Sequence, residues 1–175
     1  GAAWQQSGGE IREVVRAIVA SPGFWSARGS KFKSPLEFVV SAVRAVGGEP
    51  DDTPRLAGVV AGLGQPIYMQ SVPTGYPETG SEWVSSGALL NRMNVAIGLA
   101  AGRLPGVTVI LDPVVPLTGQ YDLLVSEIDL GLLGGAMSER TRTVILEQLV
   151  DVESPVHARA LAVGLAIGGP EFQRQ

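Results

Sequence analysis

The feature that most constrains this chain is a recurring Ser–Pro or Thr–Pro pair followed by apolar residues at helical spacing. Such pairs stand at residues 34–35, 53–54 and 154–155. A hydroxyl before a helix accepts a hydrogen bond from the first unpaired N–H groups, and proline suits the first helical position because it has no N–H to satisfy. Glu37 adds the second half of a capping box to Ser34. We therefore predict a helix after each pair.

Apolar periodicity predicts further helices elsewhere in the chain. They cover roughly residues 9–20, 86–101 and 138–150, and a weaker pattern covers 120–130. No long run of alternating polar and apolar residues competes with them. The sequence therefore predicts a mainly all-α fold, with about six to eight helices in a single domain over residues 1–175.

Two segments interrupt the helical pattern. Residues 64–85 form a long loop rich in proline, glycine and aromatic residues. We expect this loop to be ordered, because loops of such length in compact domains usually have a function and its aromatic rings can pack. Residues 107–111 are mostly β-branched, which favours a short strand. Because no second strand is evident, an extended buried connector is the alternative.

Composition excludes several classes of function. The chain has no cysteine and one histidine, which leaves no thiolate ligands, no disulfides and no multi-histidine metal site. A net charge of −4 argues against a nucleic-acid partner, since phosphates require a basic surface. No segment offers the run of about 20 apolar residues that a membrane span needs. We therefore expect no metal, no cofactor, no nucleic acid and no membrane span.

A series of short motifs runs along the chain. They are SPGFW at 21–25, KFKSPLEFV at 31–39, LGQPIY at 63–68, PTGYP at 73–77, tryptophan at 83, LLNRMN at 89–94 and GPEFQ at 169–173. In order and spacing the series resembles the C-terminal part of the bacterial DUF1800 family, a family defined by a domain of unknown function. The resemblance covers nearly the whole chain.

The resemblance implies no reaction, but it does imply the size of the whole protein, its location and its partners. Family members are much longer, so we expect this chain to be the C-terminal portion of a longer protein that packs against its N-terminal region. The resemblance also implies a bacterial protein that is exported, to the periplasm or beyond. A sulfatase-like protein encoded nearby is a further expected partner.

The long loop and the helix after it hold the candidate ligand-binding residues. Aromatic rings beside amide and acidic groups suit a saccharide, because CH groups stack on the rings while hydroxyls form hydrogen bonds. Two carboxylates in the loop would also suit glycoside hydrolysis if they faced one another across a sugar. The candidates are Gln65, Tyr68, Tyr76, Glu78, Glu82, Trp83, Arg92 and Asn94.

Structural roles are the alternative for the same residues. Tyr76 and Trp83 would anchor the loop onto the helices, and Arg92 would be a buried strut that donates to loop carbonyls. Lys31 and Lys33 precede the helix at 35, where cations oppose its dipole, so they either hold an acidic partner or a phosphate, or are simply solvated.

We favour a non-catalytic helical module of a larger exported protein, which packs against the missing N-terminal region or a partner chain. Such a module should expose a sizeable apolar patch when isolated. The alternative is part of a carbohydrate-binding or hydrolytic site built on residues 64–85 and Arg92. The sequence does not decide whether the chain is an enzyme.

Overall fold

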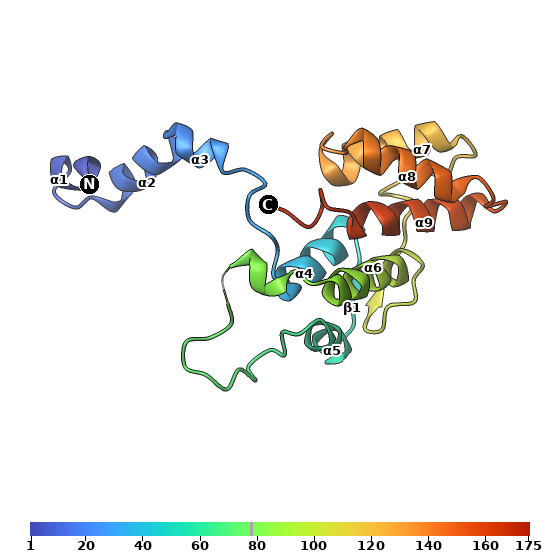
Figure 1. Cartoon of the computed structure of the whole chain (residues 1–175), viewed down its shortest axis with the longest axis horizontal. Coiled ribbons are helices and arrows are strands. Elements are labelled where there is room, and N and C mark those ends of the chain that lie inside the picture. Colours follow the sequence, from blue (N-terminus) through green and yellow to red (C-terminus); the bar gives the residue numbers. More distant parts are fainter. Residues whose placement is uncertain (78) are drawn as a thin grey trace.

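The computed structural model describes residues 1–77 and 79–175 (Figure 1). These residues contain nine α-helices and one two-stranded sheet, which confirms the mainly all-α fold. The single domain over residues 1–175 stays a prediction. The helices are α1 (Ala2–Gln6), α2 (Ile11–Val19), α3 (Pro22–Ser26), α4 (Pro35–Ala45), α5 (Arg55–Gly62), α6 (Ser86–Ala100), α7 (Tyr121–Ile128), α8 (Glu139–Leu149) and α9 (Pro155–Gly168). A 3-10 turn covers Gly80–Trp83, and a π-helical turn, Asp129–Leu133, extends α7.

Side-chain caps begin the helices much as predicted. Ser34 and Glu37 form a complete capping box at α4. The hydroxyls of Ser138 and Ser154 likewise accept backbone N–H groups at the starts of α8 and α9. The expected cap of Thr53 on α5 is wrong, because its hydroxyl donates to the carboxylate of Asp51 instead. The short helices α1 and α3 were not predicted.

The segment at 107–111 does contain a strand, but a shorter one than expected. β2 (Val107–Thr108) pairs antiparallel with β1 (Glu49–Pro50). The sequence gives no hint of β1, since glutamate and proline are both depleted in strands and proline is tolerated only at an edge. The pairing ties the end of α4 to the segment after α6.

The core is centred on α9, which packs along α6. Two glycines make the close approach possible. A Cβ on Gly164 would lie 2.7 Å from the Cα of Ile97, and a Cβ on Gly168 would lie 2.4 Å from the sulfur of Met93. A side chain at Gly164 would push the two backbones apart, whereas one at Gly168 would first displace the side chain of Met93. Buried residues of α4, α7 and α8 complete the core around this pair.

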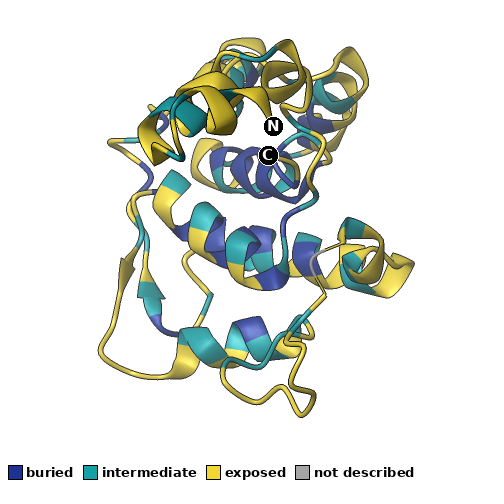
Figure 2. Ribbon diagram, turned by 90° about the vertical axis from the view of Figure 1, so that its left-hand side faces the viewer, coloured by how far each residue is buried: buried dark blue, intermediate teal, exposed yellow. Residues whose placement is uncertain are grey.

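Residues 1–30 stand apart from the core. Figure 1 shows α1, α2 and α3 extending from one side of the molecule. The buried residues, dark blue in Figure 2, all belong to the rest of the described chain. None of the three helices contributes a buried residue. We call this segment the N-terminal arm.

The chain end lies beside the base of this arm. Phe32 and Arg174 form an antiparallel β-bridge. The backbone of Lys31 exchanges hydrogen bonds with Gln175 in both directions, at 3.1 and 2.9 Å. The final residues therefore hold the segment that joins the arm to α4.

No helix within the described residues combines the length and the apolar character that crossing a membrane requires.

We expect Gly164→Ala to lower the free energy of unfolding by about 1–3 kcal/mol, because the new methyl group would force apart two packed backbones. Chemical denaturation measures the change. The matched control is Gly98→Ala in α6, where a Cβ meets nothing within 4 Å. That variant should be stabilised by up to about 1 kcal/mol through helix propensity. Equal effects of the two substitutions would contradict the close packing of α6 and α9.

Candidate functional site

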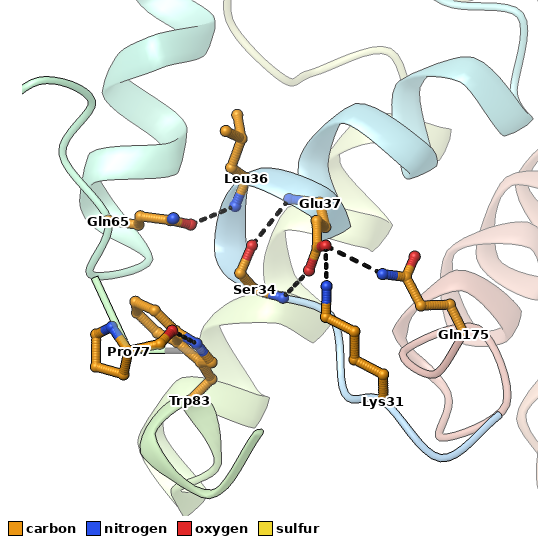
Figure 3. Close-up of polar contacts among 8 residues, drawn as sticks. All are labelled: Lys31, Ser34, Leu36, Glu37, Gln65, Pro77, Trp83 and Gln175. Atoms are coloured by element: carbon orange, nitrogen blue, oxygen red, sulfur yellow. Dashed lines mark hydrogen bonds and ion pairs between the residues drawn. The ribbon is translucent and has the colours of Figure 1, made fainter. Parts of the chain in front are cut away.

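A cleft of about 430 Å³ opens between the start of α4 and the loop at 64–85. It brings together segments that are distant in the sequence, and Figure 3 shows its polar contacts. Three of the predicted candidates line it. The lining residues are Lys31, Phe32, Ser34, Leu36, Glu37, Gln65, Tyr76, Pro77 and Trp83.

The floor of the cleft is the capped first turn of α4. The hydroxyl of Ser34 accepts the N–H of Glu37 at 3.3 Å, and the Glu37 carboxylate accepts the N–H of Ser34 at 2.8 Å. Gln65 reaches across from the end of α5, and its side-chain oxygen accepts the N–H of Leu36 at 2.8 Å (Figure 3). The cleft therefore offers few unpaired backbone donors, because side chains already occupy those of the helix end.

Glu37 is the electrostatic centre of the cleft. Its carboxylate also accepts hydrogen bonds from the ammonium group of Lys31 and from the side-chain amide of Gln175, the latter at 3.0 Å. Partial burial acts to raise the pKa of Glu37. The hydrogen bonds and the charge of Lys31 outweigh burial and lower the pKa from 4.5 to about 2. Glu37 therefore stays ionised at neutral pH and does not serve as a proton donor.

The aromatic wall of the cleft comes from the loop. The hydroxyl of Tyr76 donates to the carbonyl of Pro66, and the indole N–H of Trp83 donates to the carbonyl of Pro77 at 3.0 Å. The two ring centroids lie 6.1 Å apart. These hydrogen bonds join the loop to itself, whereas the sequence suggested anchoring onto helices. The rings thus have their polar groups engaged while they line the cleft.

Arg92 lies behind the cleft and does not line it. It is fully buried, and its guanidinium carbon lies 4.6 Å from the ring centroid of Phe32 and 5.2 Å from that of Phe38. Within the part of the chain that the structure describes, its two terminal nitrogens have no hydrogen-bond partner. Burial lowers the pKa of Arg92 to about 10, so the side chain remains a cation. The expectation that it donates to loop carbonyls is wrong: aromatic faces surround it instead.

The other candidates do not join the cleft. Tyr68, Glu82 and Asn94 are exposed and are absent from its lining. Tyr68 adopts a left-handed backbone conformation with φ of 60° at the exposed part of the loop. Glu78 lies outside the described residues. Among the described residues, Glu37 is the one carboxylate that lines the cleft, so no facing acid–base pair is found there.

Sequence reasoning missed much of the cleft. Lys31 stands before the helix, where a cation opposes the dipole, and the structure gives the reason for its position, because it pairs with Glu37. Lys33 is buried with its ammonium 3.9 Å from the ring centroid of Phe172, and burial lowers its pKa. Gln175 lies 138 residues from Glu37 in sequence, and no local pattern pointed to it.

Residues 1–174 match the family model described as "Protein of unknown function (DUF1800)". The chain belongs to the DUF1800 family. The match confirms the resemblance read from the motifs. No curated protein and no solved structure matches the chain.

We expect Glu37 to add stability to this DUF1800 chain above about pH 4.5, and that contribution should vanish as pH falls towards 2, because the folded-state pKa lies below the unfolded one. Glu37→Gln should cost about 1–2 kcal/mol near pH 6, after allowance for solvent screening of a side chain that is one-third exposed, and almost nothing near pH 2. Urea unfolding at several pH values measures the difference. Glu82→Gln, outside the cleft, is the control; a pH-independent loss in Glu37→Gln would contradict the prediction.

Proposed function

We propose that this chain is a helical interaction module of a larger, exported bacterial protein, and that the N-terminal arm is its docking element. The observation that carries the proposal is that the arm buries no residue of its own while it exposes large apolar side chains. Monomeric soluble proteins rarely leave such a surface uncovered, and apolar patches usually mark interaction sites.

The apolar residues of the arm share one face of α2. Ile11, Val14, Val15 and Ile18 follow the i, i+3, i+4, i+7 spacing of an amphipathic helix. Ile11, Val15 and Ile18 are between 51% and 71% exposed. On the polar face, Arg16 forms an ion pair with Glu13 of the same helix.

The arm is a preformed element. The indole N–H of Trp25 donates to the carbonyl of Val19 at 2.7 Å, and its ring packs edge-on against Phe24 at 5.3 Å between centroids. The N–H of Gly9 donates to the carbonyl of Trp4 at 2.9 Å, which closes the turn between α1 and α2. A surface that is already shaped loses less entropy on binding.

The resemblance to longer family members supports the choice of partners and location. In such proteins the region that precedes this segment is the first candidate for the surface that covers the arm, and a sulfatase-like protein is the second. Export rests on the same resemblance.

We expect a polypeptide that covers the preceding region of a longer family member to form a one-to-one complex with this chain. Replacement of Ile11, Val15 and Ile18 together by Asp should abolish the complex, because it places charges on the buried face. Size-exclusion chromatography with light scattering reads out the complex.

The matched control replaces Arg12 and Arg16 by Ala on the polar face and should leave the complex intact. Both variants should keep the unfolding midpoint of the wild-type core, since the arm contributes no buried residue to it. A complex that survives the triple substitution would overturn the proposal.

A second candidate function, carbohydrate binding, is favoured by the cleft. Gln65, Tyr76 and Trp83 line it together, as a saccharide site requires. The ionised state of Glu37 and the placement of Glu82 outside the cleft favour binding over hydrolysis.

We expect a bound oligosaccharide to raise the melting temperature, since a ligand at about 100 times its dissociation constant adds roughly 2.7 kcal/mol. Thermal unfolding against a panel of oligosaccharides measures this shift. Trp83→Ala should lose it, while Tyr68→Ala, outside the cleft, should retain it. A shift that persists in Trp83→Ala would count against the cleft as the binding site.

A further inference from the structure

An apolar groove lies on the core beside the base of the arm. Two hollows of about 480 and 300 Å³ adjoin one another and share Met93 and Pro170. Together the two hollows form the groove, which is lined mainly by apolar residues of α6, α8 and α9 and of the segment after α9. These lining residues are Leu89, Leu90, Met93, Val144, Leu165 and Pro170. Leu90 and Val144 are 61% and 45% exposed, so the groove is open to a partner.

The arm begins at the edge of this groove. Residues 27–31, which we call the linker, join α3 to Phe32. Phe32 lines one of the two hollows together with Arg174. The linker forms two turns, in which the N–H of Arg28 donates to the carbonyl of Trp25 at 3.2 Å and the N–H of Ser30 to that of Ala27 at 3.0 Å. The next residue, Lys31, is paired with the chain end. The linker is therefore tied to the core at Lys31. From there the arm projects away from α6, α8 and α9, the helices that line the groove (Figure 1).

We propose that the groove receives the arm of a second copy of this chain, so that two copies exchange arms about a twofold axis near residues 27–31. This inference rests on the proposed function, because it takes the arm as the docking element and names one partner for it. The two surfaces complement each other: an amphipathic helix offers Ile11, Val15 and Ile18, and a groove of apolar side chains lies uncovered. The exchange covers the apolar face of the arm and the apolar groove in both copies, and it produces a closed, self-complementary dimer.

The size of the contact fits a stable dimer. An arm that inserts one helix face and an aromatic residue buries roughly 400 Å², and each groove loses a similar area. Two exchanged arms then bury about 1,600 Å² in total, which is the standard size of a specific protein interface.

Sedimentation velocity and light scattering test the proposal on the whole chain. We expect a dimer at about 100 µM, a concentration well above a micromolar dissociation constant. Two variant chains should each be monomeric, one with Ile11, Val15 and Ile18 replaced by Asp and one with Leu90 and Val144 replaced by Asp. The control replaces Ile110 and Val150, which are exposed outside the groove, by Asp and should remain dimeric.

Mixing the two variants provides the decisive measurement. The arm variant keeps an intact groove and the groove variant keeps an intact arm, so the mixture should form a one-to-one heterodimer through a single contact. This heterodimer should bind more weakly than the wild-type dimer. A general loss of folding in either variant would not produce it, and circular dichroism confirms that each variant is folded.

A wild-type chain that is monomeric at this concentration overturns the inference, and so does a dimer that the groove variant leaves intact. Neither outcome touches the proposed function if the arm still captures the preceding region of a longer family member. Conversely, if arm substitutions change neither assembly, the docking role of the arm fails as well.

Discussion

The close contact of α6 with α9 is the constraint on which the rest of the structure depends. Gly164 and Gly168 let α9 approach the backbone of α6. Arg92 and Met93 are consecutive residues of α6: Arg92 is buried, and Met93 packs against Gly168 of α9. The contact of the two helices also sets the direction in which the chain leaves α9. Because packed helices tolerate little change in volume, the shape of the apolar groove, whose walls include Met93 of α6 and Leu165 of α9, depends on this one interface.

The chain end then links these features to the arm. Phe172 packs edge-on against Phe38 of α4, with 6.3 Å between ring centroids, and the residues after it pair with the linker. Glu171 accepts hydrogen bonds from Ser138 and Thr141 at the start of α8. One short segment thus joins α8, α4 and the base of the arm. The arm projects from this junction, which holds the chain at Lys31.

The candidate site could be predicted only in part. Aromatic and amide residues of the loop were expected together, and Gln65, Tyr76 and Trp83 do share the cleft. The same argument grouped Tyr68 with them, although it faces solvent. A loop carries no period, so its sequence does not say which residues point inward. Arg92 shows a different limit, because burial between two aromatic rings depends on segments that are remote in the sequence.

The sequence by itself determined most of the helices, the caps at Ser34, Ser138 and Ser154, and the family, because capping and apolar periodicity are local and leave their mark within a few residues. It also pointed to a short strand at 107–111 through its β-branched residues, of which residues 107–108 form β2. Only the tertiary structure decided the partner of that strand, the pairing of Lys31 with Glu37, and the separation of the arm from the core. Those features depend on which surfaces meet across long stretches of chain, and the free energy that selects them comes from packing that no local pattern encodes.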